Sequence, residues 1–122
     1  MKVWTLAEAN AELPRITDVV LRARQAVEDI RAHAATVAEA AGGNGHARKG
    51  DEAEVFNAVI EELAGEGIVL RDVDRGLVDF PARSASGRSY WLCWIVGEPE
   101  VGWWHWPEDG FAGRTPIDQP PG

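Results

Sequence analysis

The segment from residue 97 to residue 114, GEPEVGWWHWPEDGFAGR, holds the densest group of side chains that could do chemistry. An imidazole with nearby carboxylates is a ligand set for a divalent ion such as Zn²⁺, Mn²⁺ or Fe²⁺. Glu98, Glu100 and His105 are therefore the candidate metal ligands, and a divalent metal ion is the candidate cofactor. Further carboxylates from the preceding strands could join them across the sheet, namely Asp72, Asp74 and Asp79.

The competing interpretation is that His105 is hydrogen-bonded within an aromatic core and that the acidic side chains are solvated. It is favoured by the absence of a His-Glu-x-x-His motif, of paired-histidine spacing and of a cysteine-rich ligand pattern. On an extended strand, Trp103 and His105 share one face and Trp104 lies on the other.

The same region also suggests a small-molecule pocket. The chain has six tryptophans, five of which lie between Trp91 and Trp106. Their flat apolar rings could form the walls, while Arg114 or Arg88 could hold a carboxylate or phosphate in bidentate fashion. The candidate ligand-binding residues are Asp79, Trp104 and Arg114. The alternative is that the tryptophans form sheet core and a dimer interface.

Several other classes of function are excluded by composition and motifs. The sequence has no nucleophile elbow, Walker loop or dinucleotide fingerprint. Cys93, mid-strand among large apolar residues, is predicted to be an inert core thiol. The formal net charge is -8, and the basic residues are scattered among the acids rather than gathered into a patch. Nucleic acid is therefore excluded as the main partner.

Cellular location follows from the cysteine count and the hydropathy pattern. One cysteine allows no intramolecular disulfide, which fits a reducing compartment. No basic start followed by an apolar run suggests a signal peptide, and no stretch approaches the length of a membrane span. We expect a cytoplasmic protein without a membrane partner.

A long amphipathic helix is predicted over residues 6–41. Thr5 and Glu8 match a capping box at its start. Apolar residues then recur at alternating steps of three and four, which is a heptad seam of the coiled-coil type. The seam consists of Leu6, Ala9, Leu13, Ile16, Val20, Ala23, Val27, Ile30, Ala34, Val37 and Ala41. Pro14 predicts a kink near Leu13.

The remainder of the chain predicts an α+β fold in one domain, residues 1–122. A glycine-rich flexible linker spans residues 42–50, and a second helix, capped by Asp51, spans residues 51–64 and forms a hairpin with the first. A four-stranded antiparallel β-meander follows at about residues 68–106, with an irregular tail at residues 107–122. The apolar run from Tyr90 to Val96 predicts a central strand, and Pro81 is expected to end its strand or place it at an edge.

The predicted helices differ greatly in length, at about 54 Å and about 21 Å. The short helix and the sheet cannot cover the whole seam, so a second copy of the chain is the expected partner. We therefore predict a homodimer through the long N-terminal helix. The alternative is a monomer whose long helix breaks at Pro14 and folds back.

Three segments resemble a small bacterial family of unknown function, domain-of-unknown-function family 2203. They are WTLAEANAELP, GIVLRDVDRGLVDFPA and LCWIVGEPEVGWWHWPEDGFAGRTPI. The resemblance covers almost the whole chain and supports the predicted architecture. It also draws attention to Glu98, His105 and Arg114, but it implies no activity.

Two functions follow as hypotheses. The leading one is a homodimeric interaction or structural module without catalysis, since the seam is long and catalytic templates are missing. The rival is a small-molecule binding protein or a metal-assisted hydrolase with its site around Glu98, His105 and Arg114.

Overall fold

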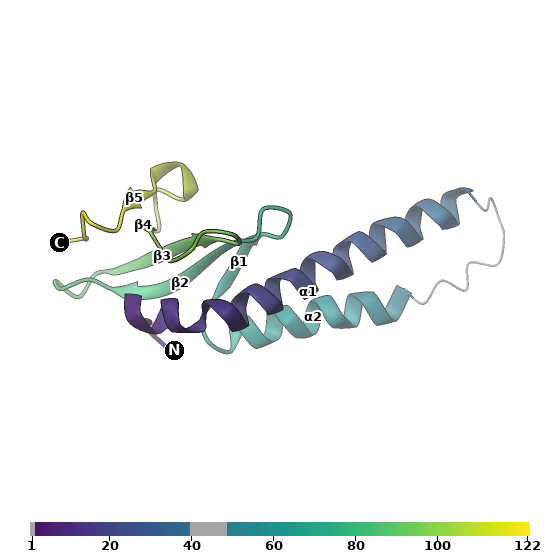
Figure 1. Ribbon diagram of the computed structural model, residues 1–122, viewed down its shortest axis with the longest axis horizontal. Coiled ribbons are helices and arrows are strands. Elements are labelled where there is room, and N and C mark those ends of the chain that lie inside the picture. The colour runs from purple at the N-terminus through teal and green to yellow at the C-terminus, as the bar shows by residue number, and fades with distance from the viewer. Residues whose placement is uncertain (1, 40–48) are drawn as a thin grey trace.

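A helical hairpin packs against one face of a five-stranded antiparallel sheet (Figure 1). The structure is a computed structural model and describes residues 2–39 and 49–122. Its helices are α1 (Leu6–Glu39) and α2 (Lys49–Ala64), followed by β1 (Val69–Asp72), β2 (Leu77–Arg83), β3 (Ser89–Ile95), β4 (Trp103–His105), the 3₁₀ helix η1 (Phe111–Gly113) and β5 (Thr115–Pro116). Among the described residues, neither helix has a stretch apolar and long enough to cross a bilayer.

The predicted α+β class and the antiparallel meander are confirmed. The strands follow one another in the order β1-β2-β3-β4-β5, with β3 in the centre as predicted. The sheet has five strands rather than four because Thr115 and Pro116, in the predicted irregular tail, pair with Trp104 and Trp103. Residues 42–48 of the predicted flexible linker lie outside the described residues, and α2 begins at Lys49, so Asp51 lies within this helix instead of capping it.

The N-terminus of α1 has the predicted capping box. The backbone amide of Thr5 donates to Glu8 Oε1 at 2.9 Å, and the amide of Glu8 donates to Thr5 Oγ1 at 3.1 Å. Two amides that the helix itself cannot satisfy are thereby paired. The helix then continues without a break through Pro14 to Glu39.

Thr5→Ala is expected to lower the free energy of unfolding by about 1 kcal/mol, because it removes the side-chain acceptor of the first turn. Urea denaturation followed by circular dichroism measures this change. Thr36→Ala is the control: Thr36 Oγ1 bonds the carbonyl of Ala32 within the helix, so its loss should matter little. Equal effects of the two variants would contradict a capping role for Thr5.

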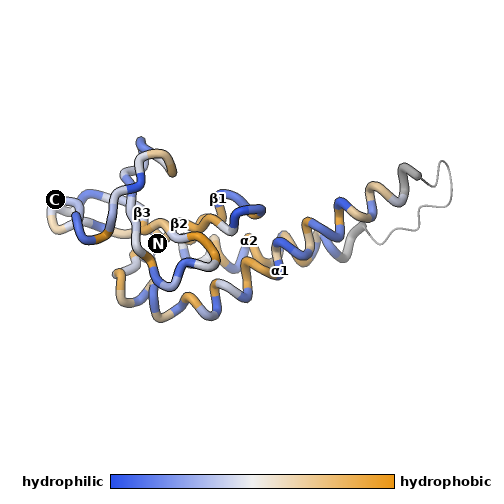
Figure 2. The backbone as a smooth tube through the Cα atoms, turned by 45° about the horizontal axis from the view of Figure 1, so that its top comes forward, coloured by the Kyte–Doolittle hydropathy of each residue, from blue (hydrophilic) through white to orange (hydrophobic). Residues whose placement is uncertain are grey.

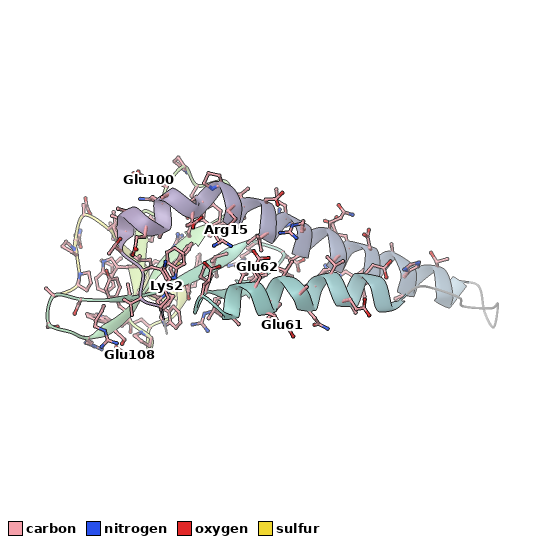
Figure 3. All side chains as sticks on the ribbon, turned by 90° about the horizontal axis from the view of Figure 1, so that it is seen from below. Lys2, Arg15, Glu61, Glu62, Glu100 and Glu108 are labelled. Atoms are coloured by element: carbon pink, nitrogen blue, oxygen red, sulfur yellow. The ribbon has the colours of Figure 1, made fainter. Side chains whose placement is uncertain are left out.

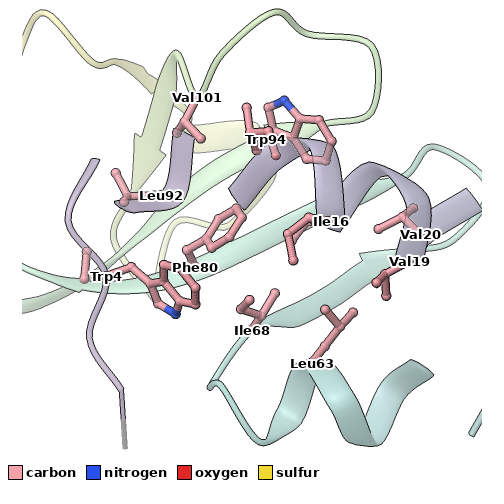
Figure 4. Close-up of a cluster of buried hydrophobic side chains, with 14 of the residues drawn as sticks. Trp4, Ile16, Val19, Val20, Leu63, Ile68, Phe80, Leu92, Trp94 and Val101 are labelled. Carbon is pink, nitrogen blue, oxygen red and sulfur yellow. The ribbon is translucent and has the colours of Figure 1, made fainter. Parts of the chain in front are cut away.

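The core lies between the helical hairpin and the inner face of the sheet (Figure 4). Alternate residues of β2 and β3 point toward α1, and Trp4 packs edge-to-face on Phe80 with ring centroids 5.5 Å apart. The largest fully buried side chains come from both layers. They are Trp4, Ile16, Val19, Val20, Val59, Leu63, Val78, Phe80, Leu92, Trp94 and Val101.

Pro81 does not end β2, so the predicted strand end is wrong, but Pro81 does lie at a local edge, where β1 no longer pairs with this strand. The strand runs on to Arg83, and Pro81 pairs with Trp91 of β3. The carbonyl of Pro81 accepts a hydrogen bond from the amide of Trp4 at 2.7 Å. The backbone polar groups at Pro81 therefore face away from β3. On that side β1 begins at Val69, opposite Asp79, and does not reach Pro81, so the missing N–H removes no ladder bond.

The heptad seam divides into two halves. Residues from Ala9 to Ala23 are buried against the sheet and α2, whereas Ile30 is 37% exposed. The hairpin extends beyond the sheet in this second half (Figure 1), and Figure 2 shows apolar residues continuing along it. Nearer the sheet, Arg15 of α1 forms an ion pair with Glu62 of α2 (Figure 3). Arg15 also pairs with Glu66, in the turn that follows α2.

Candidate metal centre

The face of the sheet opposite the helices carries three buried residues that can bind a metal. The strand register pairs Asp79 of β2 with Cys93 of β3, and Trp91 of β3 with His105 of β4. Because side chains alternate along each strand, these residues share one face. Asp79, Cys93 and His105 are 1%, 0% and 3% exposed, and one potential ligand atom from each lies within 4.8 Å of the other two.

The chain after β4 passes over this face of the sheet (Figure 1). A small pocket lies between this segment and the sheet. The pocket has a volume of about 200 Å³ and is lined by Arg71, Leu77, Asp79, Cys93, His105, Pro107, Gly110 and Phe111. Gly110 has a φ of 63°, in the left-handed region that glycine adopts without strain, and it turns the chain into η1. This turn places Phe111 in the pocket wall.

The hydrogen bonds of His105 restrict where its proton can lie. Nδ1 is 2.8 Å from the carbonyl oxygen of Trp106, and a carbonyl only accepts, so Nδ1 carries a hydrogen. Nε2 is 2.9 Å from Asp79 Oδ2, which is also an acceptor when the carboxylate is ionised. A proton or a bound cation between Nε2 and the Asp79 oxygen would satisfy this contact.

Asp79 is the centre of the cluster. Its Oδ2 atom also accepts from Arg71 Nε at 2.9 Å, while its buried Oδ1 atom has no hydrogen-bond partner among the described residues. A buried carboxylate oxygen without a partner is costly, and a bound cation would relieve that cost. Oδ1 is therefore the oxygen available to a metal.

Cys93 completes the set, and it is poorly suited to act as a free nucleophile. Burial raises the pKa of its thiol to about 12, and the charge of Asp79 adds to this increase. Both ring nitrogens of His105 are already engaged with Trp106 and Asp79, so the imidazole cannot take the thiol proton. A metal ion, in contrast, deprotonates a coordinating thiol.

In the metal-free protein, Cys93 is expected to react with Ellman's reagent more slowly than in urea by more than about 100-fold, because the thiol is buried and protonated. The chain has one cysteine, so the absorbance change reports on Cys93 alone. Stopped-flow and manual-mixing assays at pH 8 measure the two rates. Rapid stoichiometric labelling of the folded protein would contradict the placement of Cys93 in a closed site.

Glu98 and Arg114 lie together in the structure, but they form an ion pair with each other and do not join the metal-ligand group of His105. Arg114 donates to both carboxylate oxygens of Glu98, at 3.0 and 3.2 Å, and Glu98 Oε1 also accepts from the amide of Ile95. The guanidinium lies 4.8 Å from the ring centroid of Trp103 and 5.0 Å from that of Phe111. The pair thus fastens η1 to the end of β3 and holds the pocket wall in place.

Other candidates from the sequence lie elsewhere. Trp104 belongs to the core on the helix side of the sheet, away from Asp79. The segment with Glu100 lies against α1 (Figure 3), where the amide of Val101 donates to the side chain of Asn10. Asp72 and Asp74 pair with Arg75 and Arg31 on the surface. Of the predicted ligands Glu98, Glu100 and His105, only His105 belongs to the three-residue group.

The chain was compared with families, curated proteins and solved structures. The family model described as "Uncharacterized conserved protein (DUF2203)" matches residues 2–117. The chain belongs to the DUF2203 family. No curated protein and no solved structure gives a significant match. Membership in DUF2203 brings no activity with it, so the function has to be inferred from the site.

Two members of the site, Cys93 and Arg71, were missed by the sequence analysis. The apolar neighbours of Cys93 predict a core residue. Because side chains alternate along β3, however, Cys93 points to the same face of the sheet as Trp91, whereas Leu92 and Trp94 point to the other face. Asp79 gives the corresponding signal on β2, since an acid within the apolar run Leu77–Phe80 is rare without a buried partner. Arg71 gives no such signal, because it is the exposed residue of a strand whose other residues are half-buried.

Proposed function

We propose that this DUF2203 protein binds a divalent transition metal, most simply Zn²⁺, through Asp79, Cys93 and His105, and uses it to act on a small molecule. The observation that carries the proposal is the buried group of three different ligand types on the helix-free face, opening onto a pocket. A thiolate, an imidazole and a carboxylate form a set that suits zinc.

The geometry of the group supports this proposal. Tetrahedral zinc with bonds of about 2.0–2.3 Å places its ligand atoms roughly 3.5 Å apart, so ligand atoms within 4.8 Å of one another need to approach by about 1 Å. The hydrogen bond from His105 Nδ1 to the Trp106 carbonyl orients the ring and leaves Nε2 as the coordinating nitrogen. Arg71 donates to Oδ2 of Asp79, the same oxygen that His105 contacts.

Three protein ligands leave a fourth position for water, as in catalytic zinc sites. A zinc ion held by these residues would lower the pKa of its water to about 7 and would so supply a hydroxide nucleophile at neutral pH. Such a site would support hydrolysis of an ester or amide, in which water supplies both the oxygen of the acid product and the proton taken up by the leaving group. The pocket limits such a substrate to a small molecule.

Isothermal titration of the metal-free protein with Zn²⁺ tests the proposal. We expect one site per chain and release of about one proton or more, measured by comparing buffers of different ionisation enthalpy, because the Cys93 thiol is protonated before binding. His105→Gln should abolish this binding. His33→Gln is the matched control, because His33 contacts Glu52 of α2 instead of the site. Equal zinc binding by all three proteins would mean that the metal is held elsewhere.

A second candidate function is the homodimeric interaction module predicted from the seam. We infer that the part of the hairpin beyond the sheet packs against a second copy, since Ile30 and Val55 expose 37% and 45% of their surface. A groove between the helices contains Ala26 and Val55, and its other lining residues are Arg22, Gln25, Asp29 and Glu52. Two such hairpins could bury these side chains as a four-helix arrangement.

The double variant Ile30→Glu/Val55→Glu is expected to be a monomer while the unmodified protein has twice the chain mass in light scattering. Both positions are exposed in the single chain, so the charges leave its core intact. A charge at Val20 would not be a clean test, because Val20 is fully buried in that core. Val3→Glu, at a similarly exposed position outside the hairpin, serves as control. A wild-type protein that is monomeric at all concentrations would exclude this dimer.

A further inference from the structure

Arg71 lines the pocket and has hydrogen-bond donors that are available to a ligand. Its Nε atom donates to Asp79 Oδ2 at 2.9 Å, and its guanidinium carbon lies 4.9 Å from the ring centroid of Trp91. Within the described part of the chain, its two terminal nitrogens make no hydrogen bond. The side chain is 43% exposed and lines the pocket, so these nitrogens remain available to a ligand.

The other guanidinium groups nearby do not line the pocket. Arg114 is paired with Glu98 and lies between two aromatic rings. Arg75 lies over Phe111 and pairs with Asp72. Arg71 is thus distinguished by lining the pocket while it is fixed at one nitrogen, stacked on one ring and open at its remaining donors. A guanidinium held in this way is pre-organised for a bidentate acceptor.

The formal charge of the site favours a ligand with a single negative charge. With a divalent ion, the Cys93 thiolate and the Asp79 carboxylate cancel the charge of the metal, so Arg71 leaves one positive charge. A dianion such as phosphate would exceed this charge and would also face the buried Asp79 carboxylate.

The remaining walls suit an apolar body. Leu77, Pro107 and Phe111 line the pocket beside Arg71. A volume of about 200 Å³ is below the range of drug-sized sites, which begins at about 300 Å³. The ligand must therefore be small, with one charged end at Arg71 and an apolar remainder.

We propose that the ligand of this site is a small monocarboxylic acid, whose carboxylate binds Arg71 in bidentate fashion while its apolar body contacts Leu77, Pro107 and Phe111. The inference deepens the proposed function, since it names the class of molecule bound beside the metal ligands. The observations that support the anion site are the open donors of Arg71 and the pocket that it lines.

Benzoate is the probe, and benzamide is its neutral counterpart of the same shape. The indole N–H resonance of Trp91, assigned with Trp91→Phe, reports on binding because Arg71 stacks on that ring. We expect benzoate to shift it in a saturable manner, with benzamide and phosphate at least about 10-fold weaker. Arg71→Gln should weaken benzoate binding by about 10-fold or more. Arg83→Gln, whose side chain bonds the Gly87 carbonyl outside the pocket, should bind benzoate normally.

The titrations are run on metal-free and zinc-loaded samples, and zinc stoichiometry is measured on the same material. Benzoate binding that depends on Arg71 in either state supports the carboxylate site, whatever the zinc content. A protein that binds zinc but responds equally to benzoate and benzamide, or equally with and without Arg71, overturns the carboxylate proposal alone. Absence of a saturable benzoate response in both states overturns it as well, and absence of zinc binding counts separately against the metal.

Discussion

Cys93→Ser is expected to weaken zinc binding by at least about 100-fold. Loss of a residue that merely supports a metal ligand costs about 10–100-fold in affinity, and loss of one of three direct ligands should reach or exceed the upper limit. Serine is close to cysteine in size, and its hydroxyl is a far poorer ligand for zinc than a thiolate. A competition titration against a chromophoric zinc chelator measures the two affinities.

The fold of the variant is checked by circular dichroism, since Cys93 is fully buried. Asp79→Asn provides an independent test, because it removes the charge of the carboxylate while retaining its shape. It also retains an oxygen that can accept from Arg71. If folded Cys93→Ser and Asp79→Asn proteins both hold zinc as tightly as the wild type, the three-residue group is not the metal site.

Phe80→Ala is expected to lower the free energy of unfolding by about 3–5 kcal/mol. Phe80 is 0% exposed and lies where β2, α1 and the N-terminal segment meet, with Trp4 against its ring (Figure 4). Truncation leaves a cavity that none of these elements can close without moving the others. Chemical denaturation gives the value directly.

Phe111→Ala is the matched comparison, because it makes the same chemical change at a side chain that is 39% exposed. Its effect on stability should stay below about 1 kcal/mol. The same variant removes one wall of the pocket and is expected to weaken benzoate binding while leaving zinc binding intact. Equal destabilisation by the two variants would contradict the assignment of the core to the helix side of the sheet.

Much of the fold was predictable because its signals are local. The capping box at Thr5, the seam from Ala9 to Ala23 and the apolar run around Trp94 each depend on residues close together in the chain. The fifth strand was not predictable, since Thr115 and Pro116 have no strand pattern of their own and pair only because β4 offers them an edge. Continuation of β2 through Pro81 likewise depends on a distant partner, Trp4.

The site was predictable only in part, for the same reason. His105 stood out as a histidine among tryptophans, and Asp79 was considered as a carboxylate that could join it across the sheet. The strand register that places Asp79, Cys93 and His105 on one face is a property of the folded sheet. Arg71 enters the pocket next to a register shift between Leu70 and Asp72, and no sequence pattern predicts such a shift.

Elemental analysis of the protein, purified without a histidine tag or chelator from zinc-supplemented medium, tests the central claim most directly. We predict near-stoichiometric metal in the wild type and in His33→Gln, and its loss in Cys93→Ser and His105→Gln. A folded wild-type protein that is free of metal, and that takes up no zinc when it is added, would contradict a metal centre at Asp79, Cys93 and His105.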